Sequence, residues 1–358
     1  MEKNWKRIVD DIDFRRRMER RSEIIFGIRR FFRELGFFEV ETPTLVASPG
    51  MEPELDPFMT EVIAQNGTRS GVGLITSPEY SLKKLLAAGY ERIFEITRGY
   101  RNHEPWGGLH NPEFTMIEWY RTGSDYRAIM EDTERLVESL SKSLYNQSII
   151  EYQGQQIDLS APWVRLSVEE AFKKYANLDL GDMLDDVERF GRAVRDRGCE
   201  TNKSDTFDDL FYRLFLRDIE PNLGWDRPVI LYDYPHQMAS LSRLKPTDLL
   251  YAERFEAYIC GLELCNAFSE LNDPVEQRKR LDHERQERIS QGKTAFPIDE
   301  DFIEAVGRMP NSAGIALGVD RLVMLLTNAR TIEDVMFFPA VDLFGSRKED
   351  SDTKISFN

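Results

Sequence analysis

Two strand-like segments that carry acidic residues among aromatic ones constrain the fold of this chain most strongly. They span residues 114–121 and 266–271. Apolar and β-favouring residues alternate in both, and a period of two places Glu118 on one face of the first strand and Glu270 on one face of the second. A buried carboxylate without a partner is costly. We therefore expect the strands to form two walls of one pocket, whose glutamates bind the amino group of a ligand.

The length and composition are sufficient for a hydrophobic core, since the chain has 358 residues and 41% of them are apolar. No apolar run approaches the roughly 18 residues of a membrane span. Residues 1–6 also lack the apolar region of a signal peptide. We expect a cytoplasmic protein that does not bind membranes. Three cysteines and four histidines form neither a disulfide framework nor a zinc-ligand pattern.

The overall charge argues against a general nucleic-acid binder. Lys and Arg number 47 and Asp and Glu number 63, which gives a net charge of −16, and such a surface repels polyanions. One predicted helix is locally basic. It carries Arg15, Arg16, Arg17, Arg20 and Arg21. This helix is either a solvated or interface-facing helix or a docking patch for an acidic partner.

Strands and helices alternate irregularly rather than as strict βαβ units, which favours an α+β fold with an antiparallel sheet flanked by helices. We expect one domain over residues 1–344, with a helical insertion over about residues 125–223 and a polar tail over residues 345–358. The patterns predict helices over residues 15–35, 125–147, 168–197, 206–218, 276–291 and 319–326, a helix between Ser77 and Gly89, and strands over residues 37–40, 92–100 and 228–235.

Two arginines and two further glutamates have types and positions suited to phosphate chemistry. Arg101 and Arg321 lie at the ends of predicted elements, where a guanidinium can bind a phosphate or carboxylate through two hydrogen bonds. Glu256 and Glu263 are hard ligands of the kind that Mg²⁺ prefers. Alternation places Glu263 on the face opposite to Asn266, so a β-bulge is needed to bring them into one cavity. The residues alone predict a pocket for a cationic small molecule, with or without a nucleotide.

Four ordered segments resemble the motifs of class II aminoacyl-tRNA synthetases in their lysyl version. Residues 101–120 resemble motif 2, residues 314–322 resemble motif 3, and residues 21–43 resemble motif 1. The segment from residue 263 to residue 271 adds a fourth match. The resemblance implies a class II synthetase-like catalytic core that uses ATP and Mg²⁺, and a homodimer formed through motif 1.

Motif 1 begins close to Met1, which leaves no room for the anticodon-binding domain of lysyl-tRNA synthetases, so we expect no anticodon recognition. A core of this kind is similar to the elongation factor P–lysine ligase family. That family activates lysine or (R)-β-lysine with ATP and attaches it to a lysine side chain of elongation factor P. Ala316 agrees, because this family carries alanine where lysyl-tRNA synthetases usually have glycine. One methyl group shifts substrate choice by roughly 1–3 kcal/mol, and the family prefers the β-amino acid.

Two other functions stay open at this point. One is a free-standing amino-acid-activating ligase that acts on a tRNA, a carrier protein or a small molecule. The other is a catalytically silent synthetase paralogue that serves as a regulatory or assembly subunit. The retained charges at Arg101, Glu256, Glu263 and Arg321 argue against silence.

The resemblance implies roles for particular residues. Arg101 and Arg321 are the expected catalytic residues. The expected ATP site consists of Arg101, His110, Phe114 and Arg321, with either His103 or Glu104 at the adenine edge, and Glu256 and Glu263 are the expected Mg²⁺ ligands. The expected amino-acid site consists of Glu79, Glu118, Tyr120, Asn266, Phe268, Glu270 and Ala316. Two positions depart from the family pattern, namely the spacing between Arg101 and Glu104 and the residue Ala267, which replaces a glycine.

Overall fold

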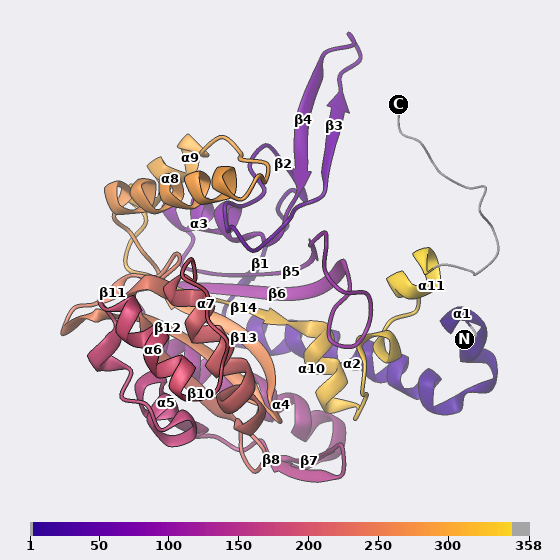
Figure 1. Cartoon of the computed structure of the whole chain (residues 1–358). Coiled ribbons are helices and arrows are strands. Elements are labelled where there is room, and N and C mark those ends of the chain that lie inside the picture. Colours follow the sequence, from indigo (N-terminus) through magenta and orange to yellow (C-terminus); the bar gives the residue numbers. More distant parts are fainter. Residues whose placement is uncertain (1–2, 346–358) are drawn as a thin grey trace.

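A twisted nine-stranded sheet is the centre of the fold (Figure 1). The computed structural model describes residues 3–345, so the expected polar tail lies outside them except for Gly345. The strand order is β1 (Phe38–Glu39), β5 (Arg92–Tyr100), β6 (Glu113–Thr122), β14 (Ser312–Gly318), β13 (Leu262–Ser269), β12 (Asp248–Ile259), β10 (Val229–Pro235) and β9 (Val164–Ser167), and β11 (Leu244–Lys245) pairs with β12. Only β1–β5 and β10–β9 are parallel pairs among these strands. The expected α+β class is confirmed.

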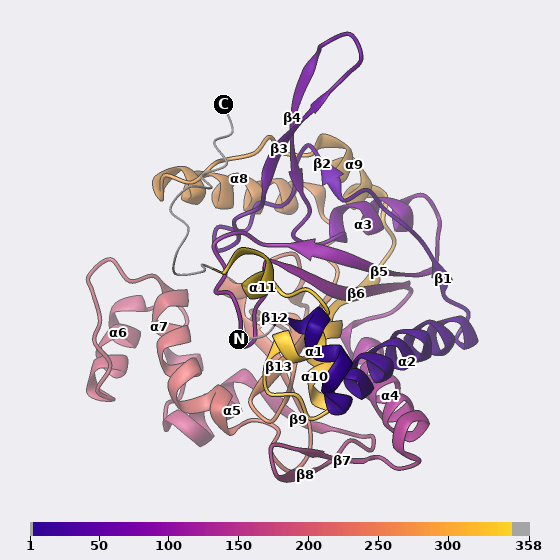
Figure 2. The same ribbon diagram turned by 90° about the vertical axis from the view of Figure 1, so that its right-hand side faces the viewer.

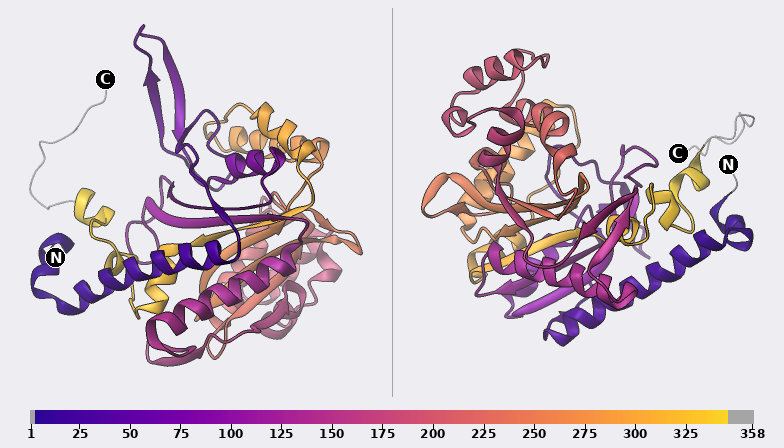
Figure 3. Two further views of the ribbon diagram at one scale, coloured as in Figure 1. Left: turned by 180° about the vertical axis from the view of Figure 1, so that it is seen from behind. Right: turned by 90° about the horizontal axis from the view of Figure 1, so that it is seen from below.

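One face of the sheet is covered by three helices, which Figure 3 shows from behind and from below. They are α2 (Ile12–Glu34), α4 (Tyr126–Tyr145) and α10 (Val319–Leu326). Phe32 of α2 lies between Phe94 and Trp119 of the sheet, with ring centroids 5.2 and 4.9 Å away. All three side chains are fully buried. Burying each such side chain contributes about 1.5–3 kcal/mol, against roughly 0–1 kcal/mol for a surface ion pair, so this face stabilises the fold.

The opposite face of the sheet carries two groups of helices, and residues of both groups line a cleft. The first group is α3 (Glu79–Ala87), α8 (Pro274–Ser290) and α9 (Glu300–Arg308), and the second is α5 (Val168–Ala176), α6 (Val187–Asp196) and α7 (Phe207–Leu214). Tyr80 and Phe302 stack at 4.0 Å and join α3 to α9. The expected helix between Ser77 and Gly89 is confirmed, and the Ser77 hydroxyl accepts from the Glu79 N–H at 3.1 Å.

Residues 125–223 do not form a helical insertion throughout. The amphipathic helix α4 packs into the main core behind the sheet, and β9 is an edge strand of the sheet itself. Between them lies the hairpin of β7 (Ile149–Tyr152) and β8 (Gln155–Asp158). Only the later part forms a separate hydrophobic cluster. In this cluster α5, α6, α7 and the π-helical turn η2 (Phe215–Ile219) pack against side chains of β10 and β12. The short turns η1 (Gly181–Met183) and η3 (Glu220–Asn222) lie in the same part of the chain.

The remaining elements lie at the ends of the cleft and at the chain termini. β2 (Leu45–Val46), β3 (Met59–Ile63) and β4 (Arg69–Leu74) form a small sheet, whose hairpin projects from the body of the protein (Figure 2). The other elements are α1 (Asn4–Asp10), η4 (His236–Met238), η5 (Ile332–Val335) and α11 (Ala340–Phe344). Over residues 3–345, no helix combines the length and the hydropathy needed to cross a membrane.

Candidate active site

The two acidic strands, β6 and β13, lie in one sheet rather than forming two opposing walls. Together with β14 between them, they form a surface that we call the floor of the site. β14 lies between β6 and β13 and pairs with both of them. Ala316 of β14 is therefore the partner of Glu118 on one side and of Asn266 on the other. The expectation of facing walls was wrong because alternation fixes which face a side chain occupies, but not which strands become neighbours.

A β-bulge brings Glu263 onto this floor. Ala257 of β12 pairs with Cys265, whereas the next residue, Tyr258, pairs with Glu263, so Leu264 has no opposite residue. The extra residue reverses the alternation at this point. Glu263 consequently shares a face with Asn266, and both residues line the same cleft.

Glu270 has an internal cation, which sequence reasoning missed. The Lys83 ammonium lies 2.6 Å from Glu270 Oε2 and 2.5 Å from Glu79 Oε1. Lys83 and Glu270 are both fully buried. The expectation that only a ligand supplies the cation was therefore wrong for Glu270. Burial raises the pKa of Glu270 to about 8, although Lys83 opposes this shift, and Glu270 Oε1 has no hydrogen-bond partner in the described part of the chain.

Within the part of the chain that the structure describes, Glu118 is held by neutral groups alone. Ser77 Oγ donates to Glu118 Oε1 at 2.5 Å, and the Tyr120 hydroxyl donates to Oε2 at 2.8 Å. Burial and the nearby Glu79 raise the pKa of Glu118 to about 8. Among the described residues, Lys83 thus pairs with Glu79 and Glu270 but not with Glu118. A cation of the ligand would stabilise the ionised form of Glu118.

Gly314 leaves the space that this cluster needs. A Cβ atom at Gly314 would lie 2.1 Å from Tyr120 Cε1 and 2.6 Å from Glu270 Oε1. A side chain at this position would have to displace the Tyr120 ring and the Glu270 carboxylate. The glycine in β14 is therefore required by packing.

The predicted nucleotide residues gather at the other end of the floor. The Arg101 guanidinium lies 5.0 Å from the centroid of the Phe114 ring. This ring covers Gly99, where a Cβ atom would come within 2.6 Å of Phe114 Cζ. Burial lowers the pKa of Arg101. The Arg321 guanidinium donates to the Glu263 carbonyl oxygen at 3.0 Å.

The structure separates the two candidates for the adenine edge. Glu104 lines the cleft and lies 2.9 Å from His110 Nδ1, a contact that lowers the pKa of Glu104. His103 points away and contacts Asp56 at 3.1 Å, and its side chain is 77% exposed. The geometry therefore favours Glu104.

The two expected Mg²⁺ ligands differ in availability. Glu256 accepts hydrogen bonds from Tyr234 at 2.6 Å, Tyr258 at 2.5 Å and Arg254 at 2.6 Å. Among residues 3–345, the side chain of Glu263 accepts only one long contact, from Arg321 at 3.5 Å. Burial together with the nearby Glu256 raises the pKa of Glu263. Within residues 3–345, no three His, Cys, Asp or Glu side chains are grouped as a metal site. The pair of hard carboxylates fits Mg²⁺ that is also bound by nucleotide phosphates.

The floor opens into a cleft of about 1900 Å³. Thirteen Asp or Glu residues and seven Lys or Arg residues line it. Twelve of the predicted site residues lie on its surface, namely Glu79, Arg101, Glu104, His110, Phe114, Tyr120, Glu256, Glu263, Asn266, Phe268, Ala316 and Arg321. His103 lies outside it, and the fully buried Glu118 and Glu270 lie beneath it.

Sequence reasoning also missed residues that support the site. Ser77 and Lys83 hold the carboxylates, and Arg254 donates to Asn266 Oδ1 at 3.1 Å. Asp320 accepts from the Thr115 N–H at 2.7 Å and pairs with Arg21 at 2.6 Å. Arg21 is thus an internal residue rather than part of a surface patch. The spacing of Glu79 and Lys83, four residues apart on a helix, was an available signal.

Residues 2–342 match the family described as tRNA synthetases class II (D, K and N). The chain belongs to this class II synthetase family. Its similar proteins include the lysine–tRNA ligase of Pelotomaculum thermopropionicum, which is 40% identical over 324 residues, or 90% of this chain and 62% of the relative. The lysine–tRNA ligase of Bacillus subtilis is 38% identical over 320 residues, or 89% of this chain and 62% of the relative.

The lysine–tRNA ligase of Campylobacter jejuni is 39% identical over 340 residues, which cover 94% of this chain and 66% of the relative. This class II synthetase chain therefore spans less than two thirds of the length of these curated relatives.

Proposed function

We propose that this protein activates lysine or (R)-β-lysine with ATP as an aminoacyl adenylate and transfers the aminoacyl group to a lysine side chain of elongation factor P. The observation that carries the proposal is the cluster of Glu79, Glu118 and Glu270, in which Lys83 pairs with Glu79 and Glu270, and no cation of residues 3–345 pairs with Glu118. A second ammonium group is what this cluster lacks. Relatives named lysine–tRNA ligase support an amino acid with a side-chain amine.

The proposed activation is an in-line displacement at phosphorus. The amino-acid carboxylate attacks the α-phosphorus of ATP, an acyl phosphate bond forms, the bond to the bridging oxygen of the β-phosphate breaks, and pyrophosphate leaves. Arg101 would stabilise the charge that develops on the α-phosphate oxygens. Mg²⁺ held by Glu263 and Glu256 would neutralise phosphate charge. No protein nucleophile is needed.

In the proposed second step, a neutral lysine amine of the acceptor attacks the acyl carbon of the adenylate. An amide bond forms, the acyl phosphate bond breaks, AMP leaves, and the proton lost by the amine passes to solvent. The acidic lining of the cleft favours the approach of a cationic lysine side chain, which must lose a proton before it attacks, over the approach of a polyanion such as tRNA. Ala316 is the strand partner of both Glu118 and Asn266. Its methyl group therefore adjoins the proposed amino-acid site, which supports discrimination between lysine isomers.

Amino-acid-dependent ATP–pyrophosphate exchange tests the activation step. We expect exchange with lysine, (R)-β-lysine or both, and none with alanine or glutamate. Absence of exchange with both lysine isomers would refute the proposal.

Charging of tRNA is a second candidate, favoured by the names of the relatives. Incubation with ATP, labelled amino acid and either elongation factor P or tRNA separates the two. A mass gain on the factor supports the proposed function, whereas label on tRNA alone supports the second candidate.

A further inference from the structure

The loop that joins β5 to β6 carries Arg101, Glu104 and His110, and it is held in place from the C-terminal part of the chain. The Ile332 N–H of η5 donates to the Gly108 carbonyl oxygen at 2.8 Å. In return, the Gly108 N–H donates to Glu333 Oε2 at 3.2 Å. η5 therefore binds both backbone groups of one loop residue.

The loop backbone is shaped to receive the Glu333 side chain. Gly107 and Gly108 have φ values of +102° and +68°, which favour glycine. A Cβ atom at Gly107 would lie 2.3 Å from Glu333 Oε1. Gly107 and His110 also exchange backbone hydrogen bonds at 3.0 and 3.3 Å. Fixing Gly107 and Gly108 thus fixes His110, and through it Glu104.

The end of the loop is attached to the same segment. Asn111 Oδ1 accepts from the Ala340 N–H at 2.8 Å, at the start of α11. The Trp106 ring lies 5.8 Å from the Phe344 ring of α11. The C-terminal segment therefore contacts the loop at Trp106, Gly108 and Asn111.

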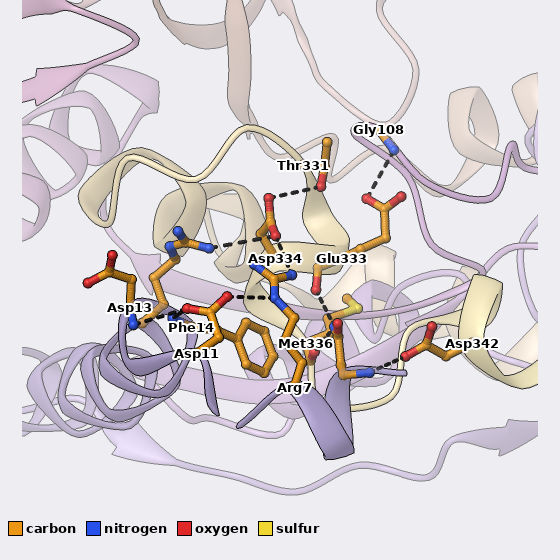
Figure 4. Close-up of polar contacts among 12 residues, drawn as sticks. Arg7, Asp11, Asp13, Phe14, Gly108, Thr331, Glu333, Asp334, Met336 and Asp342 are labelled. Carbon is orange, nitrogen blue, oxygen red and sulfur yellow. Dashed lines mark hydrogen bonds and ion pairs between the residues drawn. The ribbon is translucent and has the colours of Figure 1, made fainter. Parts of the chain in front are cut away.

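The N-terminal helix holds this segment from its other side (Figure 4). Asn4 Nδ2 donates to the carbonyl oxygens of Glu333 at 2.7 Å and Met336 at 2.8 Å. The Asn4 N–H donates to Asp342 Oδ2 at 2.7 Å. Arg7 pairs with Asp334 at 2.9 Å. Asn4 is 5% exposed, so the hydrogen bonds of its side-chain amide are shielded from water.

We propose that Glu333 is a positioning residue for nucleotide binding, and that Asn4 couples helix α1 to the same loop. Glu333 touches no expected substrate atom, but it sets the backbone from which Glu104 and His110 project. This inference rests on the proposed function, because it assigns the loop to ATP. The amino-acid site lies on the sheet floor and is not held by Glu333.

Steady-state exchange kinetics test the positioning role. We expect Glu333→Ala to raise KM for ATP about 5- to 20-fold, the range for losing one hydrogen bond to a charged acceptor, and to leave KM for lysine within about twofold. Glu333→Gln keeps an acceptor oxygen and should restore most of the ATP affinity. Glu304→Ala, which removes an exposed glutamate of α9 paired with Arg308, is the matched control. Equal changes in both KM values, or none, would overturn the proposal.

Hydrogen exchange of the free protein tests the coupling without any activity. Glu333→Ala and Asn4→Ala should each accelerate amide exchange at Gly107, Gly108 and His110, whereas Glu304→Ala should not. Unchanged protection in both variants would overturn the coupling. If the wild-type protein shows no ATP–pyrophosphate exchange, the proposed function fails, and the hydrogen-exchange result still decides whether η5 and α1 hold the loop.

Discussion

At the residue scale, the main feature of the cleft is that its buried carboxylates have few positively charged partners among the described residues. Lys83 is shared by Glu79 and Glu270, while Glu118 has only hydroxyl donors. Removing one partner of a buried pair costs about 3–5 kcal/mol, far more than an exposed pair contributes. These residues therefore determine both the local stability and the ligand charge that the site accepts.

Arg101→Ala should reduce the rate of amino-acid-dependent ATP–pyrophosphate exchange by at least about 100-fold, because a guanidinium aimed at developing phosphate charge contributes several kcal/mol. Arg98→Ala removes an exposed arginine of β5, three residues before Arg101, and should leave the rate within about twofold. Comparable losses in both variants would remove the special role of Arg101.

The pH dependence of lysine binding follows from Glu118 and Glu270, whose pKa values burial raises to about 8. Below this pH a carboxyl must lose its proton before it can bind the ammonium, so affinity should rise up to about tenfold per pH unit between about pH 6 and about pH 8, and then level off. Calorimetry at several pH values measures this rise. Glu118→Gln should flatten it, and an unchanged slope in that variant would assign the proton elsewhere.

The same pKa values determine how the stability of the ligand-free protein changes with pH. A carboxyl whose folded pKa is about 8, against an ordinary value of 4.5, keeps a proton that the unfolded chain releases. Its contribution to the free energy of unfolding is therefore full below about pH 4.5 and is lost as the pH rises through about 8. Denaturant unfolding of wild-type and Glu118→Gln proteins should converge at low pH and differ most above about pH 8.

At the element scale, local patterns predicted most elements but not their neighbours. β5 has the expected bounds, and the helix after Ser77 begins where the proline predicts. Three long-range features could not be predicted from the sequence. They are the position of β14 between the acidic strands, the packing of α4 into the core, and the contact of Lys83 with Glu270 across the fold. Pairing between distant strands depends on the whole sheet rather than on any local period.

The bulge in β13 could be predicted from the sequence only in part. The need for it followed from the spacing of Glu263 and Asn266, while its position at Leu264 came only from the register. Most of the site residues assigned by resemblance line one cleft, whereas His103 lies outside it. The supporting residues Ser77, Lys83 and Arg254 required the structure.

Gly314→Ala tests the close packing of β14 against the carboxylate cluster. The added methyl group collides with Tyr120 and Glu270, so we expect a loss of about 1–3 kcal/mol in the free energy of unfolding together with weaker lysine binding. Gly71→Ala in β4, where nothing lies within 4 Å of the added Cβ, is the control. Urea unfolding measures both, and equal stability of the two variants would contradict the packing described for Gly314.

At the scale of the whole molecule, charge and exposed apolar surface indicate different partners. The net charge of −16 and the acidic cleft favour cationic ligands. Helices α1 and α2 instead expose large apolar side chains, including Trp5, Val9, Ile12 and Phe26. We propose that a second copy of the chain covers this surface, since the resemblance to motif 1 implies a homodimer formed through α2 and large exposed apolar side chains mark interfaces.

Light scattering during size-exclusion chromatography tests the proposed homodimer. We expect twice the chain mass of 41.7 kDa, and we expect Phe26→Asp, which places a charge on the 67% exposed Phe26, to shift the protein toward the monomer. Leu249→Asp, at a 65% exposed leucine of β12, is the control. A monomeric wild-type protein would exclude the dimer.

Formation of an enzyme-bound aminoacyl adenylate is the most direct test of the central claim that the cleft holds a diamino acid beside ATP. The purified protein is incubated with ATP, Mg²⁺ and lysine or (R)-β-lysine, then denatured, and the released small molecules are identified by mass spectrometry. We predict lysyl or β-lysyl adenylate, formed with an equal amount of pyrophosphate and absent from Glu118→Gln. Unchanged ATP and free amino acid in the wild-type sample, with both isomers, would contradict the claim.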